Sequence, residues 1–117
     1  MHPKSPKLLD DVMRSCHYFT EDTRGKTLAN YLDDRRLRQV VERNLGMIGE
    51  ALYRLRTINP ETAERIANVH QIIGLRNRLA HGYDDEIDDA LIWRSVQESI
   101  PILLSETESL LPPFDAE

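Results

Sequence analysis

The 117-residue sequence has a single cysteine and no long apolar run. Cys16 has no partner for a disulfide or a thiolate metal cluster, so we interpret it as a small buried hydrophobe rather than a reactive thiol. No stretch approaches the roughly 20 apolar residues that span a bilayer, and the opening MHPKSPKLLDD lacks the apolar segment of a secretory signal. We therefore expect a cytoplasmic protein without a membrane segment.

The sequence also lacks the patterns of β-structure and of repeat proteins. It contains no alternation of apolar and polar residues of strand length, no internal repeat and no low-complexity segment. With 40% hydrophobic residues, a chain of this length can bury one core but not two. We therefore predict a single all-α domain over residues 1–117, an up-and-down bundle of four main helices with an additional short helix.

Helix start signals place the elements of the first half. Ser5 followed by Pro6 predicts a helix from about residue 6 to residue 20, because serine can cap the free N–H groups and proline needs no donor in the first turn. The segment TLANYL is expected to add a short helical turn. Asp33 or Asp34 should then cap a longer helix. Its apolar residues recur in steps of four and three: Val41, Leu45, Ile48, Leu52 and Leu55.

The second half repeats these signals. Asn59 and Pro60 predict a third helix that continues to about residue 81. Asp84 or Asp85 is expected to cap the last helix, which Pro101 should kink. The apolar residues of this last helix have heptad-like spacing: Trp93, Val96, Ile100, Leu103 and Leu110.

Charge is unevenly distributed along the chain. The net charge is -5, yet residues 35–78 carry nine basic and four acidic groups, whereas residues 84–117 carry one basic and ten acidic groups. All nine basic residues of the middle section are arginines, whose planar fork suits phosphate recognition. Two interpretations remain open: helices of opposite charge that attract one another, or a surface that faces phosphate.

An arginine interrupts the apolar face of the third predicted helix. On a wheel of about 100° per residue this face comprises Val69, Ile72, Ile73, Leu79 and Ala80. Arg76 falls near its middle, so its guanidinium must reach solvent, pair with a carboxylate or line a cleft. His81 points about 140° away from Arg76, near Asn77. A structural interpretation pairs Arg76 with a core acid and leaves His81 as a polar helix end.

The motif RNRLAHGY, residues 76–83, resembles the signature of HEPN domains, and more closely that of the HepT-like group, in which a tyrosine follows two positions after the histidine. The segments ERNLGMIGEAL (42–52) and YDDEIDDALIWRSVQESIPIL (83–103) are also similar to that group. The resemblance covers most of residues 35–105 and matches the core motif without gaps. It implies an α-helical bundle that dimerises and places both motifs in a shared cleft.

The resemblance further implies a metal-independent endoribonuclease. RNA cleavage without a metal needs a base for the ribose 2′-OH and a fixed cation for the phosphate. His81 would be the base or acid and Arg76 the phosphate-binding cation, while Asn77 would orient the phosphate, the ribose or His81. No cofactor is expected. The four histidines, at positions 2, 17, 70 and 81, lack a close ligand pair such as H-x-x-x-H, so no metal site is predicted.

By the same resemblance, Tyr83 is the residue to which an MntA-like nucleotidyltransferase antitoxin attaches AMP. The added phosphate would place negative charge beside Arg76 and His81 and compete with RNA. The alternative is that Tyr83 simply packs, because it falls on the apolar face of the wheel. Glu50, opposite the apolar stripe of its helix, is expected either to be solvated or to pair with an arginine. Trp93 is interpreted as core or dimer interface rather than a platform for base stacking.

Three functions are consistent with these features. The first is the toxin of a type VII-like toxin–antitoxin pair that cuts RNA. The second is a non-catalytic HEPN-like dimer that binds a minimal nucleotidyltransferase, and the third is a structural helical dimer without a ligand. The intact set of Arg76, Asn77 and His81 favours the first, because a pure binding module has no need of it.

Overall fold

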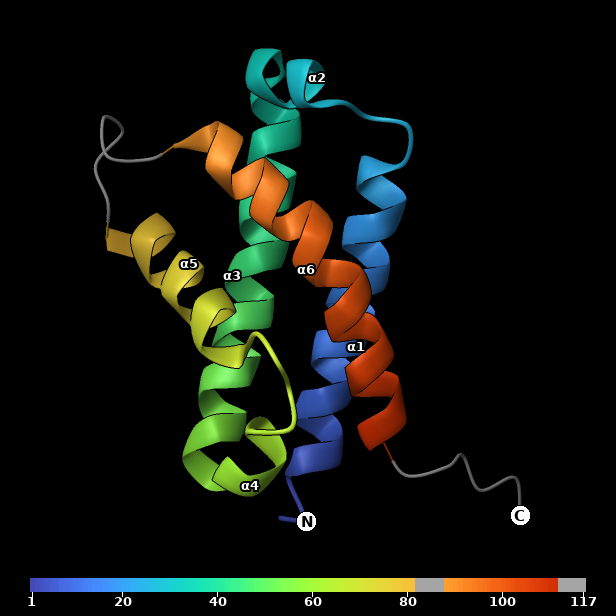
Figure 1. The fold of residues 1–117 in the computed structure, drawn as a ribbon, viewed down its shortest axis with the longest axis vertical. Helices are drawn as coiled ribbons and strands as arrows, with labels where there is room; N and C mark the ends of the chain where they lie inside the picture. The colour runs from blue at the N-terminus through green and yellow to red at the C-terminus, as the bar shows by residue number, and fades with distance from the viewer. Residues whose placement is uncertain (82–87, 112–117) are drawn as a thin grey trace.

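The computed structural model describes residues 1–81 and 88–111, and of His81 only the backbone. The described residues form helices and no strand (Figure 1), which confirms the predicted all-α class. The helices are α1 (Ser5–Thr23), α2 (Leu28–Asp33), α3 (Arg35–Ile58), α4 (Pro60–Ala63), α5 (Val69–His81) and α6 (Asp89–Leu110). No helix among these residues is long and apolar enough to cross a membrane.

The four longer helices run alternately up and down, with α3 at the centre (Figure 1). α3 packs against α1 on one side and α5 on the other, while α6 packs against α1. The short α2 contacts both α3 and α6 at one end of the bundle. The up-and-down four-helix arrangement is therefore as predicted, with two short helices rather than one.

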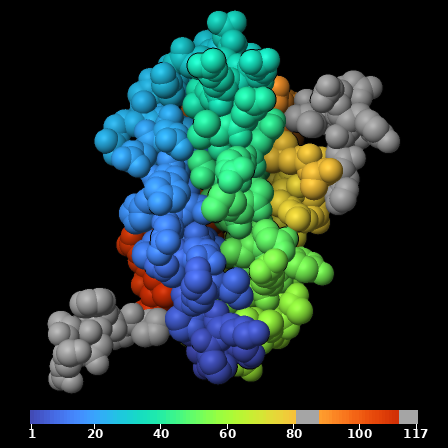
Figure 2. Space-filling model, turned by 180° about the vertical axis from the view of Figure 1, so that it is seen from behind, coloured from blue at the N-terminus to red at the C-terminus, as the bar shows by residue number. Residues whose placement is uncertain are grey.

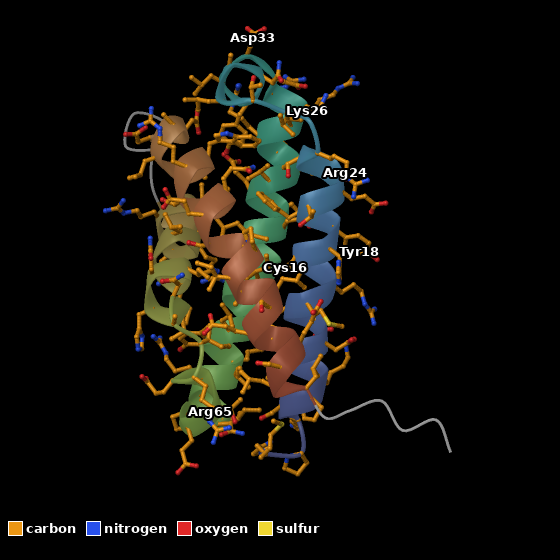
Figure 3. All side chains as sticks on the ribbon, turned by 45° about the vertical axis from the view of Figure 1, so that its right-hand side comes forward. Cys16, Tyr18, Arg24, Lys26, Asp33 and Arg65 are labelled. Atoms are coloured by element: carbon orange, nitrogen blue, oxygen red, sulfur yellow. The ribbon has the colours of Figure 1, made fainter. Side chains whose placement is uncertain are left out.

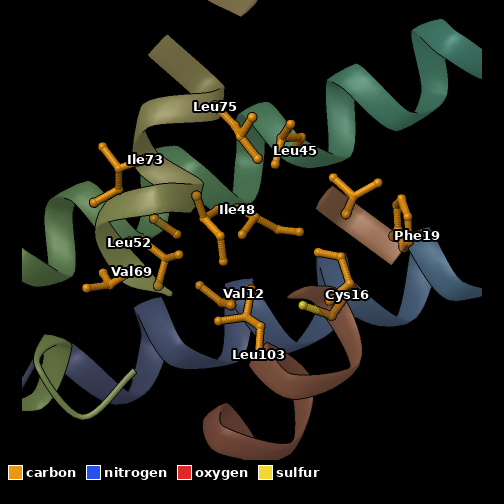
Figure 4. Close-up of a cluster of buried hydrophobic side chains, with 14 of the residues drawn as sticks. Val12, Cys16, Phe19, Leu45, Ile48, Leu52, Val69, Ile73, Leu75 and Leu103 are labelled. Atoms are coloured by element: carbon orange, nitrogen blue, oxygen red, sulfur yellow. The ribbon is translucent and has the colours of Figure 1, made fainter. Parts of the chain in front are cut away.

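The core lies where the apolar stripes of these helices meet (Figure 4). The entire predicted stripe of α3, from Val41 to Leu55, is buried, as are Trp93, Val96, Ile100 and Leu103 of α6. The Trp93 ring stacks on Tyr31 with ring centroids 4.9 Å apart, which confirms the core interpretation of this tryptophan. Cys16 is fully buried, and burial raises the pKa of its thiol to about 12. The interpretation of Cys16 as a buried hydrophobe is also confirmed.

Side-chain caps occur at two of the helix starts predicted from the sequence, those at Asp34 and Asn59. The Asp34 carboxylate accepts from the backbone N–H groups of Arg36 and Leu37 at 3.0 and 3.2 Å, and Asn59 accepts from Thr62 N–H at 3.3 Å. Ser5, however, is not a cap, because α1 begins at Ser5 itself and Lys4 occupies the cap position without a side-chain bond.

The buried Ser5 hydroxyl has another partner. It accepts a hydrogen bond from Asn59 Nδ2 at 3.0 Å, so it ties the start of α1 to the residue after α3. The serine therefore contributes a contact between distant segments, which a pattern of neighbouring residues does not reveal. At its other end α1 extends to Thr23, beyond the predicted end.

The third predicted helix is wrong as a continuous element, because α4 ends at Ala63 and α5 begins at Val69. In the connection, the Glu106 carboxylate of α6 accepts from Ala67 N–H at 3.1 and 3.2 Å. In an uninterrupted helix this N–H would bond to the carbonyl of Ala63. That carbonyl instead accepts from Ile66 N–H at 3.0 Å, and Ile66 is buried. A distant carboxylate and a buried isoleucine thus stabilise the break.

The start of α6 also differs from the prediction. α6 begins at Asp89, and the Asp88 carboxylate caps it by accepting from Leu91 N–H at 3.1 Å. Asp84 and Asp85, the predicted caps, lie outside the described residues. Within α6 the helix continues through Pro101 to Leu110.

Candidate functional site

Arg76 lies at a close approach of α5 to α3. A Cβ added to Gly49 of α3 would lie 2.4 Å from the Arg76 Cβ and 2.7 Å from its Cγ, distances that real side chains do not tolerate. The absence of a side chain at Gly49 therefore allows the aliphatic stem of Arg76 to lie directly against α3. The Arg76 side chain is only 31% exposed. This packing explains how an arginine can occupy the apolar face of a helix, because its stem is buried while its charged end reaches outward.

The guanidinium of Arg76 has two partners. Its Nη2 donates to Glu50 Oε2 at 3.1 Å, and its Nη1 donates to Asn77 Oδ1, also at 3.1 Å. The other Glu50 oxygen accepts from Arg54 Nε at 2.9 Å. We refer to Glu50, Arg54, Arg76 and Asn77 as the Glu50 cluster. Of the two expectations for Glu50, solvation or an arginine partner, the second is the one observed.

The Glu50 cluster keeps a net positive charge, because one carboxylate is shared by two guanidinium groups. The Glu50 side chain is 39% exposed, and an ion pair this accessible to water contributes only about 0–1 kcal/mol to folding. The principal consequence of the contacts is therefore orientation. A guanidinium has five N–H donors, and Glu50 and Asn77 together use two of them. The remaining donors are available to an anionic ligand such as a phosphate.

The described structure brings together two of the four predicted site residues, Arg76 and Asn77. The side chain of His81 and all of Tyr83 lie outside the described residues, so their positions relative to Arg76 stay predictions. The backbone of His81 forms the last residue of α5.

The apolar face predicted for α5 is confirmed in its first part and at Leu79, which packs against the core, and is wrong at Ala80. Val69, Ile72 and Ile73 are buried, whereas Leu79 is half-buried and Ala80 is exposed. Leu75, which the wheel did not include, is buried. The reason is that α5 is anchored in the core through its first two turns, while its last turns lie largely in solvent. The motif therefore occupies the exposed end of a helix that is anchored at its start.

Two residues of this site, Gly49 and Arg54, were not predicted from the sequence, although both left a signal. A glycine in the middle of a helix costs about 1 kcal/mol relative to alanine, so Gly46 and Gly49 of α3 both mark candidate close contacts, and the structure shows one at Gly49 but not at Gly46. Arg54 follows Glu50 by four residues, the spacing at which oppositely charged side chains meet on a helix.

The arginine-rich middle of the chain serves more than one purpose. Arg38 donates from Nη1 to the carbonyls of Tyr31 and Leu32, at 3.2 and 2.6 Å, and its Nε lies 3.9 Å from Asp89 of α6. Within the described ranges, this is the only arginine of α3 with an ion pair to α6. Five of the ten acidic residues of 84–117 lie outside the described residues, so the two interpretations of the arginine-rich section both stay open.

The described residues contain no group of three His, Cys, Asp or Glu side chains placed to hold a metal ion.

Comparisons with known proteins agree with the motif. The family described as ribonuclease HepT-like matches residues 10–110. A protein of Methanocaldococcus jannaschii, named as a candidate RNase, is 34% identical over 102 residues, which cover 86% of this chain and 90% of that protein. A candidate ribonuclease HepT of Thermococcus cleftensis is 28% identical over 106 residues, 87% of this chain and 91% of that protein. No solved structure matches the chain. Because this family match covers most of the chain, the chain belongs to the ribonuclease HepT-like family.

Proposed function

We propose that this chain is a metal-independent endoribonuclease and the toxin of a type VII-like toxin–antitoxin pair. The observation that carries the proposal is the way in which Glu50 and Asn77 hold the Arg76 guanidinium at the exposed end of α5, with N–H donors left for a phosphate. Membership of the ribonuclease HepT-like family supports the same activity.

The proposed reaction uses the neighbouring ribose as nucleophile. His81 accepts the proton of the 2′-OH, and the 2′-oxygen attacks the adjacent phosphorus. The bond from phosphorus to the 5′-oxygen breaks, and this oxygen takes up a proton from the imidazolium or from water. The products are a 2′,3′-cyclic phosphate and a free 5′-OH. Arg76 stabilises the charge that develops on the non-bridging phosphate oxygens.

From the contacts of Arg76 we propose supporting roles for its neighbours. Glu50 and Asn77 restrict the guanidinium to one orientation, so that less of its freedom is lost when phosphate binds. Glu50 in this role is a positioning residue, since it touches Arg76 rather than the phosphate. Arg54 shares the Glu50 carboxylate and keeps the site positive overall.

The proposal includes two partners. A second copy of the chain forms a homodimer in which two α5 ends share one cleft, so that Arg76 of one chain can combine with His81 across the cleft. A nucleotidyltransferase antitoxin transfers AMP to the Tyr83 hydroxyl, with loss of pyrophosphate from ATP. The new phosphate competes with RNA for Arg76 by direct charge pairing.

The test is cleavage of a labelled RNA in the presence of EDTA by wild type, His81→Ala and Arg76→Ala, with folding checked by circular dichroism. Arg78→Ala is the matched control, because Arg78 is an exposed arginine on the same helix. The proposal predicts that wild type and Arg78→Ala produce cyclic-phosphate ends, while the other two lose at least about 100-fold in rate.

The opposite outcomes are equally informative. If EDTA abolishes cleavage by wild type, the metal-independent mechanism is wrong. If all four proteins are folded and inert, the chain is not a nuclease under these conditions, and the account becomes that of a non-catalytic dimer that binds a minimal nucleotidyltransferase.

A further inference from the structure

A groove runs between α1 and α3 on the face of the molecule where α1, α3 and α5 lie side by side (Figure 2). It consists of two hollows of about 350 and 330 Å³, which share Leu8 and Arg54 and therefore adjoin. Both volumes fall within the range of about 300–1,000 Å³ that is typical of ligand sites. The remaining lining residues are Lys4, Lys7, Tyr53, Thr57 and Ile58 in one hollow and Asp11, Arg14, Ser15, Tyr18, Met47, Glu50 and Ala51 in the other.

Each hollow exposes one tyrosine. Tyr18 is 49% exposed and Tyr53 is 48% exposed, and Figure 3 shows Tyr18 on the outward side of α1. Aromatic side chains make up only 6% of the sequence, and the remaining described tyrosine, Tyr31, is fully buried. Most of the solvent-exposed aromatic surface of the described residues therefore lies in this one groove. Exposed aromatic rings are the usual platforms on which unpaired nucleic-acid bases stack.

The charge of the groove is positive, although that of the chain is negative. Four basic and two acidic side chains line it, in a protein of net charge -5. Three of the four cations have a carboxylate partner: Lys7 Nζ lies 2.6 Å from Asp11, Arg54 Nε 2.9 Å from Glu50, and Arg14 Nη2 2.7 Å from Asp10, which lies outside the two hollows. One positive charge remains when all three carboxylates are counted. The cations of such a surface attract polyanions. Its exposed rings favour a nucleic acid over an acidic protein segment, because a nucleic acid also carries bases that can stack on them.

Glu50 links the groove to the proposed catalytic arginine. Glu50 lines one hollow through its position on α3, and its Oε2 accepts from Arg76 Nη2 at 3.1 Å. The Glu50 side chain therefore separates this hollow from Arg76, which itself lines neither hollow.

From this placement we infer that the groove between α1 and α3 binds single-stranded RNA, with bases stacked on Tyr18 and Tyr53 and phosphates on Lys7 and Arg14. The inference rests on the proposed nuclease function and specifies its substrate as unpaired rather than duplex RNA. A double helix conceals the base faces that the tyrosines would stack against, whereas a single strand exposes them.

The test measures binding of a short labelled oligonucleotide, single-stranded or annealed to its complement, by fluorescence anisotropy in a His81→Ala background that prevents cleavage. Tyr18→Ala and Tyr53→Ala should each weaken single-strand binding by about tenfold, because stacking on one aromatic ring contributes about that factor. Tyr18→Phe and Tyr53→Phe keep the rings and should bind within about twofold of the background protein. Lys7→Gln should reduce the salt dependence by about one phosphate contact.

Ile102→Ala is the matched control for loss of an exposed apolar side chain, since Ile102 is 48% exposed and lies on α6 rather than in the groove. Unchanged binding by both alanine variants, or equal binding of duplex, would overturn the inference. Loss of binding that coincides with conversion of a dimer to a monomer in ultracentrifugation would also overturn it, and would assign the face to a second copy of the chain.

Cleavage by the same variants with His81 restored separates this inference from the proposed function. If wild type cleaves and the alanine variants show an unchanged KM, the groove proposal fails and the nuclease stands. If wild type never cleaves but single-strand binding depends on both tyrosines, the groove stands and the nuclease fails.

Discussion

The two ends of α5 differ in what they contribute. Its first turns place Val69, Ile72 and Ile73 in the core, while its last turns leave Asn77 and Ala80 exposed. Arg76 lies at the boundary, with its stem packed on α3 and its charge outside. The comparison shows how a small bundle can present a charged group in a fixed position. One half of the helix supplies rigidity through burial, and the other half supplies the chemistry.

The buried half should control stability. Ile72 is 1% exposed, so Ile72→Ala leaves a cavity and should destabilise the fold by about 2–5 kcal/mol. Urea unfolding measures this change. Cleavage corrected for the folded fraction should remain near the wild-type rate, and a large loss per folded molecule would show that the two halves are not separable.

The exposed half should control activity. Arg76→Lys keeps the charge and most of the stem but loses the planar fork that contacts Glu50 and Asn77 at once. The cleavage rate should fall by about 100-fold, with an unfolding midpoint close to that of wild type. A lysine variant that cleaves at the wild-type rate would mean that charge alone suffices and that orientation by the Glu50 cluster is irrelevant.

The boundary between the halves can be strained directly. Gly49→Ala adds a Cβ 2.4 Å from the Arg76 Cβ and should cost about 1–3 kcal/mol, with a parallel loss of cleavage as α5 shifts. Gly46→Ala is the matched control on the same helix, because no atom lies within 4 Å of its added Cβ. That variant should be neutral or stabilised by up to about 1 kcal/mol. Equal effects at the two glycines would show that the close contact is not specific.

Cys16 lies in the same core as the first half of α5 (Figure 4), so the pH at which its thiol ionises is a probe of that core. Burial raises the pKa of this thiol from its ordinary value of 9.0 to about 12, so the unfolded chain loses its proton before the folded chain does. The contribution of Cys16 to stability is therefore fully present below pH 9 and declines as the pH rises towards 12.

Cys16→Val, which cannot ionise, should reduce this alkaline decline, as measured by the free energy of unfolding at a series of pH values. An identical decline in both proteins would show that other groups cause it.

The sequence predicted what depends on local repetition and could not predict what depends on distant partners. The stripe from Val41 to Leu55 follows from helical periodicity, and it is buried as expected. The break before α5 depends on Glu106, 39 residues beyond Ala67, so no local pattern signals it. The unusual position of Arg76 could be predicted, because it places a charged residue on the apolar face of a helix. The family could be predicted from the resemblance of the motif. The pairing of Arg76 with Glu50 could not be predicted, because it depends on how α5 packs against α3.

The most direct test of the account is a double-mutant cycle between Glu50 and Arg76, scored by the rate of RNA cleavage. If Glu50 acts by holding Arg76, Glu50→Gln should slow wild type by about tenfold and have no further effect in the Arg76→Ala background, because the guanidinium that it holds is absent there. Independent, multiplicative losses from the two substitutions would contradict the account, since Glu50 would then act on cleavage by a route that does not pass through Arg76.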